Sequence, residues 1–569
     1  MIFGNNCLLQ GFKNLNFERK RLLALILMTI IFCALCGPYL QSYILPYSYS
    51  PAIRGIITFC YLIFIAVYAV SMGGLNIGFD GMPRTNRLLG VWVVVGLVGV
   101  CFSSIFYSSL IRELEWIGWI LFCFSVSEIV VKDESFAQKI TILVPLGFMF
   151  CTLLIIIKWS LLDDPHNFRW AEDPEPFSNI RHIGYYAVGA FVCSFQLFFD
   201  RKLSRFHVFI IFALGLYSLA FVFWTGGRGA MVSVLVVSLL ALVFSSWNKR
   251  LIFYLLLVFP LAILLSDVFW VKGMSFGFYN SASLSHGANG DISNLRFSIW
   301  SDIPRHMSGH WLFGLGADGY NYVPKFLQGT VQPHNVYIQF ITDWGVIGGL
   351  CFISFLAIIV VRGGMTAFGD RLKGECGAYV VGLLLLCSMG VHGLFDGTFY
   401  HALPLLLSGL GLAMTVPLVS RVGSKKLNYF IGSAWSFVCV AALLLPIVLH
   451  LIIIKVQWYP DEPMPQGESV KVVRLFPSDI ARVPYWVASW KSQGLIGPEE
   501  YVSWLQWIQR YSNKAWHYAA IEAGYVRRMG NSVLADELER KALEVTPDSD
   551  VYRKRVRRLA GSSTSKGAD

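Results

Sequence analysis

The chain has 569 residues, of which 55% are hydrophobic and only 14% are charged, and its formal net charge is +11. Soluble domains carry about 25% charged residues, so this composition excludes an ordinary soluble protein and indicates that a bilayer surrounds most of the chain. The surplus lysines and arginines lie in short clusters between apolar runs. They therefore indicate membrane topology and give no sign of a nucleic-acid partner.

Apolar stretches long enough to cross about 30 Å of hydrocarbon predict an all-α polytopic membrane protein of about 13 transmembrane helices. The stretches lie near residues 22–40, 54–72, 88–107, 113–131, 139–161, 182–199, 207–224, 230–247, 251–270, 336–361, 376–394, 402–420 and 428–455. The first follows a basic segment but has no small-residue cleavage site, so we expect it to remain as an anchor. An odd number of spans places the two termini on opposite sides of the membrane.

Lysine and arginine are concentrated in alternate loops, which predicts the orientation of the chain. With the N-terminus in the cytoplasm every cytoplasmic loop is basic, from Lys20 and Arg21 at the start to Lys425 and Lys426 near the end. The short external loop at residues 395–400 contains no lysine or arginine. The C-terminal tail is therefore expected on the external side.

Three external segments are the places where we expect function. They are a loop near residues 162–181, a long loop at residues 271–335 and a tail that begins near residue 457. The long loop contains the aromatic and glycine-turn pattern WLFGLGADGY, which is not typical of a disordered linker. We therefore divide the chain into a transmembrane domain, residues 1–456, and an external helical tail, residues 457–569, which is periplasmic if the membrane is a bacterial inner membrane.

The tail has helical patterns at about residues 498–511, 514–529 and 531–546. Ala535, Ala542 and Pro547 have the spacing of the small residues and terminal proline in the second helix of a tetratricopeptide unit. A single unit cannot bury its own apolar face, so it must stack on the helices before it. A generic helical cap is an equally good interpretation of this pattern.

Arg228 is the first candidate for chemistry, in the segment WTGGRGA at the start of a span. The flanking glycines let the backbone approach a ligand, and the N–H groups at a helix N-terminus add to the guanidinium to bind an anion such as phosphate. Arg181, next to His182, also lies where an external loop enters a span. The two arginines together would bind a diphosphate, although each alone is compatible with a side chain that snorkels to water.

His334 is the best candidate for a general base, because histidine titrates near neutral pH and can accept a proton from a hydroxyl. It lies in VQPHNVYIQF at the end of the long loop, and Asn335 beside it can fix the ring or a ligand. His392 and Asp396 belong to another cluster, in the external turn GVHGLFDGTFYHA. Asp396 can orient a base or bind sugar hydroxyls, and each of these residues also has a purely structural interpretation.

Familiar cofactor motifs are missing from the sequence. There is no Walker pattern, no glycine-rich dinucleotide loop, no HExxH and no pair of external aspartates suited to a catalytic metal. Nearly all of the 12 cysteines lie within apolar segments and have neither zinc nor disulfide spacing. We therefore expect no metal and no cofactor.

Taken together, TGGRGA, SNLRFSIW and FGLGADGY in the long loop, and PHNVYIQFITDWGVIGG resemble the O-antigen ligase superfamily. The superfamily includes O-antigen ligases, O-antigen polymerases and protein O-oligosaccharyltransferases. The resemblance implies a GT-C-like glycosyltransferase of the bacterial inner membrane that moves a glycan from undecaprenyl diphosphate to an acceptor hydroxyl at the periplasmic face. It implies His334 as the base for an inverting transfer, with Arg228 and, by position alone, Arg181 on the donor diphosphate.

The acceptor is left open by the resemblance. The long external tail favours a protein acceptor slightly, since lipid A ligases generally end soon after their last span, while a lipid A core ligase or a surface-polysaccharide polymerase are the alternatives. A flippase for lipid-linked glycans is a different class with a similar number of spans. Transporters, however, usually show internal repeats and charges near the middle of the membrane. A membrane scaffold would leave the arginine and histidine motifs unexplained.

Overall fold

The computed structural model describes residues 17–44, 50–72, 82–168, 180–199, 204–268, 296–322, 332–373, 377–420, 483–492, 494–511, 515–544 and 550–561, together with residues 170, 174, 176, 177 and 546. Within these ranges every regular element is a helix. The predicted all-α class is therefore confirmed for the described part of the chain.

The helices of the membrane part follow the predicted spans closely. They are α2 (Phe17–Leu35), α3 (Gly37–Ile44), α4 (Ser50–Met72), α5 (Pro83–Phe102), α6 (Phe106–Lys132), α7 (Glu134–Leu161), α8 (Ile180–Cys193), α9 (Gln196–Phe199), α10 (Arg205–Thr225), α11 (Arg228–Phe244), α12 (Lys249–Val268), α15 (Val336–Lys373), α16 (Ala378–His392) and α17 (Ala402–Ser420).

Eight of the described helical stretches are long and apolar enough to cross a membrane, and four shorter apolar helices accompany them. These helices coincide with every predicted span except the one near residues 428–455, which lies outside the described residues. The total of thirteen spans therefore stays a prediction. One difference is local: the first predicted span is divided near Gly37, where α2 ends and α3 begins.

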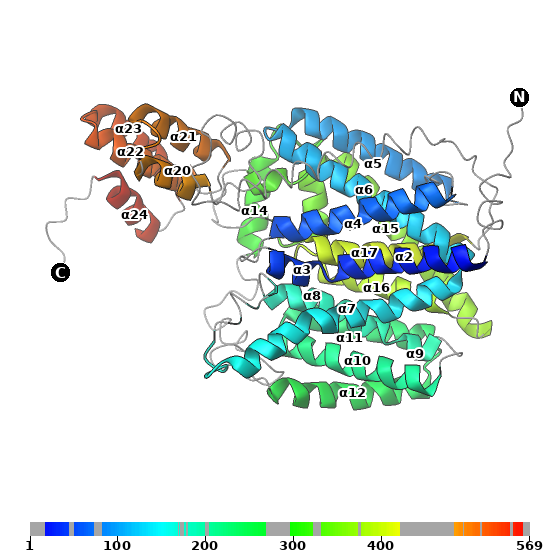
Figure 1. The fold of residues 1–569 in the computed structure, drawn as a ribbon. Helices are drawn as coiled ribbons and strands as arrows, with labels where there is room; N and C mark the ends of the chain where they lie inside the picture. The colour runs from blue at the N-terminus through cyan, green and yellow to red at the C-terminus, as the bar shows by residue number, and fades with distance from the viewer. Residues whose placement is uncertain are drawn as a thin grey trace, which may run out of the picture.

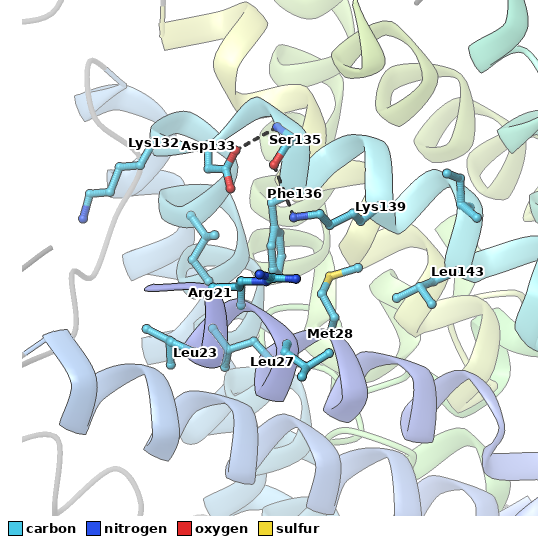
Figure 2. Close-up of a pocket in the computed structure, with 14 residues that line it drawn as sticks. Arg21, Leu23, Leu27, Met28, Lys132, Asp133, Ser135, Phe136, Lys139 and Leu143 are labelled. Carbon is cyan, nitrogen blue, oxygen red and sulfur yellow. Dashed lines mark hydrogen bonds between the residues drawn. The ribbon is translucent and has the colours of Figure 1, made fainter. Parts of the chain in front are cut away.

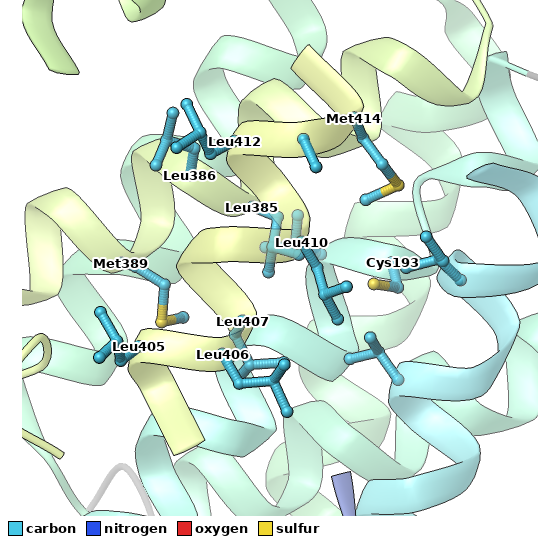
Figure 3. Packing of buried hydrophobic residues seen from close by; sticks show 14 of the residues in the cluster. Cys193, Leu385, Leu386, Met389, Leu405, Leu406, Leu407, Leu410, Leu412 and Met414 are labelled. Atoms are coloured by element: carbon cyan, nitrogen blue, oxygen red, sulfur yellow. The ribbon is translucent and has the colours of Figure 1, made fainter. Parts of the chain in front are cut away.

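The centre of the bundle is the hairpin of α16 and α17, whose side chains are almost all buried (Figure 3). Small residues let the two backbones approach: a Cβ on Gly382 would lie 2.4 Å from the Cβ of Met414. Close approach through glycine is the usual means of helix association in a membrane, where lipid offers no hydrophobic drive. Cys193 packs in this same apolar cluster, as the sequence predicted for its cysteines.

The ends of the helices alternate between the two ends of the bundle (Figure 1). Helices α8, α11, α15 and α17 begin, and α7, α10 and α16 end, at the end that carries α14 (Arg296–His306) and the 3₁₀ turn η2 (Gly319–Tyr322). This end holds every residue that the sequence selected for chemistry. We call it the loop end.

Helix α15 is interrupted at Gly345, where φ is +66°. The turn at residues 311–315 lies alongside this break. The N–H of Val346 donates to the carbonyl of Trp311 (2.8 Å), and the N–H of Leu315 donates to the carbonyl of Thr342 (2.9 Å). The break leaves backbone groups of α15 without partners inside the helix. Because buried backbone groups must be paired, they bond to the long loop and hold it in place.

The tail contains α20 (Val483–Ser492), α21 (Pro498–Tyr511), α22 (Ala515–Arg528), α23 (Ser532–Glu544) and α24 (Asp550–Ala560). The three helices expected near residues 498–511, 514–529 and 531–546 are present within one or two residues of the predicted ends. Ala535 and Ala542 are fully buried, and α22 packs on α21, α23 and α24. Pro547 lies outside the described residues, and the tetratricopeptide assignment stays a prediction.

Candidate functional site

His334 and Asp396 form a hydrogen-bonded pair at the loop end. Nδ1 of His334 lies 2.9 Å from Oδ1 of Asp396, and the same oxygen accepts from the N–H of Gly397 at 2.9 Å. A carboxylate only accepts hydrogen bonds, so Nδ1 carries the proton and Nε2 keeps its lone pair. Among the described residues Nε2 has no hydrogen-bond partner. This is the arrangement of a histidine that is ready to take a proton.

The carboxyl group of Asp396 remains ionised although it is buried. Burial acts to raise its pKa, but the hydrogen bond and charge of His334, the charge of Arg181 and a hydrogen bond from Tyr185 hold the pKa well below its usual value. The ionised carboxylate can stabilise the imidazolium that forms when His334 takes up a proton.

The backbone around His334 is held in an unusual conformation. His334 has φ +52°, in the left-handed region that non-glycine residues seldom adopt. The indole of Trp300 donates to the carbonyl of Pro333 (2.9 Å), and the N–H of Val336 donates to the carbonyl of Gly393 (2.8 Å). Contacts on both sides therefore fix the histidine between the long loop and the turn that follows α16.

Asn335 caps α15. Its side-chain oxygen accepts from the N–H groups of Tyr337 (3.0 Å) and Ile338 (3.1 Å), and its amide donates to the carbonyl of Leu394 (3.2 Å). The structure thus gives Asn335 a defined supporting contact, which joins the start of α15 to the turn that carries Asp396.

Helix α14 carries a third arginine into this region. Ile299 and Ile303 on α14, and Met307 directly after it, are buried with Leu315 and Tyr320 in one cluster, to which Ile338 of α15 adds. This packing holds Arg296, the first residue of α14, near the arginines of the membrane helices. Burial lowers the pKa of Arg296, and Arg181 and Arg228 lower it further while Asp396 opposes them. The three arginines and Asp396 therefore share one electrostatic environment.

Arg228 is the first residue of α11, and the start of this helix lies against His392. Gly226 ends α10 with φ +62°, and Gly227 caps α11 without a side-chain hydrogen bond, so N–H groups of the first turn of α11 are left for a ligand. A Cβ on Gly229 would lie 3.0 Å from Cδ2 of His392. Glycine at this position lets α11 lie directly against the ring. Arg228 and Arg181 are both exposed.

Tyrosine and histidine rings of α8, α16 and the turn before α17 contact one another next to Asp396. The ring of Tyr185 lies 4.8 Å from that of His392, and the rings of His182 and His401 are 4.3 Å apart. Burial and the neighbouring His182 lower the pKa of His401 well below its usual value. His401 is therefore neutral, and its Nε2 lies 3.3 Å from the amide nitrogen of Gln332.

A buried ionic network connects the loop end to the helices α4 and α6. Arg112 donates to Glu115 (2.8 Å) and to the carbonyl of Tyr400 (2.9 Å), while Arg54 lies 3.8 Å from Glu115 and 3.9 Å from Asp318. Burial raises the pKa of Asp318, and the positive charges of Arg54 and Arg112 oppose that rise. The network ties the long loop, through Asp318, and the turn after α16, through Tyr400, to the membrane helices α4 and α6.

The structure thus brings together His334, Asp396, His392, Arg228 and Arg181, which the sequence selected separately. Sequence reasoning missed Arg296 and Tyr185. Arg296 stands in the segment SNLRFSIW, and an arginine at the start of a helix within the long loop is the signal that could have identified it. Tyr185 had no such signal, because a tyrosine inside an apolar helix looks like any packing residue.

Residues 212–353 match the model of the O-antigen ligase family. The matched segment runs from α10 through α11, α12 and the long loop into α15, and so includes Arg228, Arg296 and His334. A search of curated proteins found no match to the chain.

Proposed function

We propose that this chain, whose residues 212–353 match the O-antigen ligase family, transfers a glycan from undecaprenyl diphosphate to an acceptor hydroxyl at the periplasmic face of the bacterial inner membrane. The observation that carries the proposal is the Nδ1 contact of 2.9 Å between His334 and Asp396 beside three arginines. Transfer of a sugar from a lipid diphosphate requires a base for the acceptor hydroxyl and a cationic site for the departing diphosphate. The loop end of the bundle offers both.

In the proposed reaction, Nε2 of His334 removes the proton of the acceptor hydroxyl as its oxygen attacks the anomeric carbon of the donor sugar. A new carbon–oxygen bond forms on one face of the sugar, and the bond from the anomeric carbon to the diphosphate oxygen breaks on the other. The configuration is therefore inverted. The lipid diphosphate departs with the bonding electron pair, and the proton remains on His334, stabilised by Asp396.

The arginines have the second role. Arg228 and Arg296, with Arg181, stabilise the negative charge that grows on the departing diphosphate, and the free N–H groups at the start of α11 add to them. Guanidinium groups suit this role because each can bind two phosphate oxygens at once. Three cations supply the charge neutralisation, so the mechanism needs no metal ion.

This proposal gives the two parts of the chain separate roles. Residues 1–456 would hold the donor and perform the transfer, and residues 457–569 would meet the acceptor. The paired helices α22 and α23, which pack on α21 and α24, support a protein acceptor, because stacked helical pairs form surfaces that bind extended segments. A lipid A core ligase and a surface-polysaccharide polymerase are the alternatives, with the same membrane domain and a different acceptor.

The test of the transfer reaction uses His334→Ala and Arg228→Ala in the native host. We expect a loss of transfer of about 10²–10⁴-fold for His334→Ala, with lipid-linked glycan accumulating on the periplasmic side. His207→Ala and Arg84→Ala are matched controls, since both residues are exposed at the opposite end of the bundle. Unchanged glycan products in the site variants would reject the site, and accumulation on the cytoplasmic side would favour a flippase.

Deletion of the tail tests which kind of acceptor the protein uses. A chain that lacks residues 465–569 is expected to lose transfer to protein while it still binds lipid-linked glycan. If surface polysaccharide disappears and glycoproteins are unchanged, the acceptor is a lipid or a growing glycan. Protein abundance in the membrane must be measured in parallel, so that a lost product is not confused with a lost enzyme.

A further inference from the structure

A cavity lies at the end of the bundle away from His334. It has a volume of about 810 Å³ and is bounded by α2, the end of α6 and the start of α7 (Figure 2). Helix α2 begins and α6 ends here, whereas the candidate site lies where α16 ends and α17 begins. The cavity is therefore separate from the proposed transfer site.

Two cationic side chains of this cavity, Arg21 and Lys139, are not paired with a carboxylate among the described residues. Asp133 accepts from the N–H of Ser135 (2.9 Å) as the cap of α7, and Lys132 is paired with Glu128 at 2.6 Å. Lys139 donates only to the neutral hydroxyl of Ser135 (3.3 Å). Arg21 points toward α7 (Figure 2), and within the described residues it makes no ion pair. Arg21 and Lys139 thus present positive charge that no carboxylate neutralises directly.

The rest of the cavity is apolar. The apolar lining residues with exposed surface are Ala24 and Leu25 of α2 and Ile142 and Leu143 of α7, while Met28 and Phe136 are buried (Figure 2). The cavity therefore has cations near the end of the bundle and an apolar floor deeper along the helices. This arrangement is complementary to an amphiphile, whose anionic head would meet the cations and whose hydrocarbon chains would meet the apolar lining.

We propose that this cavity binds an anionic phospholipid from the cytoplasmic leaflet. Its phosphate contacts Arg21 and Lys139, and an acyl chain lies along Leu25, Ile142 and Leu143. The assignment to the cytoplasmic leaflet rests on the basic loops at this end of the bundle. A free phosphate would use the two cations but would leave the apolar floor without a partner.

The test measures lipid retained by the purified full chain. The protein is incorporated into nanodiscs made of phosphatidylcholine with a minor fraction of phosphatidylglycerol, extracted, and analysed by native mass spectrometry for co-purified lipid. We expect retained phosphatidylglycerol, and a fall of about tenfold or more in the double variant Arg21→Gln/Lys139→Gln, since two charge-assisted contacts are lost. Arg84→Gln/Arg87→Gln is the matched control, because these arginines lie exposed at the start of α5.

A charge-preserving variant separates binding from packing. Arg21→Lys/Lys139→Arg is expected to retain the lipid. Equal loss in this variant would show that the substitutions disturb packing and would overturn the proposal, as would equal retention of phosphatidylcholine or no change in the Gln variant. Displacement of the lipid by soluble glycerol phosphate would show that the cavity binds phosphate alone and would also overturn it.

Discussion

Asp396 fixes the ring of His334 from a distance of 62 residues along the chain, through the contact of 2.9 Å between Oδ1 and Nδ1. The pair joins the end of the long loop to the turn between α16 and α17. Because the carboxylate can only accept, the pair selects one tautomer of the histidine.

Asp396→Asn is expected to reduce the turnover of glycan transfer by about 10²–10⁴-fold, with a smaller effect on donor binding. The asparagine amide can donate to Nδ1, which would place the proton on Nε2 and remove the lone pair that the base needs. The measurement is initial rate against donor concentration in proteoliposomes. Asp302→Asn is the control, because this carboxylate pairs with His306 on α14. A variant that keeps more than half of the wild-type turnover would contradict the assigned role.

The depressed pKa of Asp396 also predicts how stability depends on pH. The ionised form is favoured in the folded protein, so its contribution to stability is fully present above the unfolded pKa of about 3.9 and is lost as pH falls through the lower folded value. The difference in melting temperature between wild type and Asp396→Asn should therefore shrink as the pH falls below about pH 4. A difference that stays constant from pH 5 to pH 2 would contradict the depressed pKa of Asp396.

Arg296→Ala is expected to lower transfer by about 10²–10³-fold, because a cation that stabilises the departing diphosphate is removed. Arg296→Lys should recover part of this loss, since it restores the charge without the two-point contact to phosphate. Arg305→Ala, in the exposed last turn of the same helix, is the control. Equal rates for the Ala variants of Arg296 and Arg305 would remove Arg296 from the site.

Gly345→Ala is expected to destabilise the protein by about 1–3 kcal/mol and to lower activity. A Cβ on Gly345 would lie 2.2 Å from the carbonyl oxygen of Leu312, and φ at this residue is +66°. The substitution should therefore displace the turn of the long loop that packs on α15. Gly90→Ala is the control, since Gly90 lies in α5 with nothing within 4 Å of its added Cβ. Thermal unfolding and transfer rates measured on both variants test this prediction.

Much of the fold could be predicted from the sequence because a bilayer imposes a simple rule. A helix that crosses hydrocarbon must be about 20 apolar residues long, so each apolar run marks one helix. The break of α15 at Gly345 was not predictable from hydropathy, because it depends on a loop turn that packs against the helix. Similarly, the divided first span at Gly37 depends on packing against α4.

The all-helical membrane class, the helices of the tail and the candidates His334 and Arg228 could be predicted from the chain alone, because hydropathy and local motifs are properties of neighbouring residues. Which candidates belong together became clear from the packing of the helices. The pairing of His334 with Asp396, the approach of Arg296 to Arg181 and Arg228, and the buried link from Arg54 to Asp318 join segments far apart in the chain. Such contacts depend on helix packing, which no local pattern encodes.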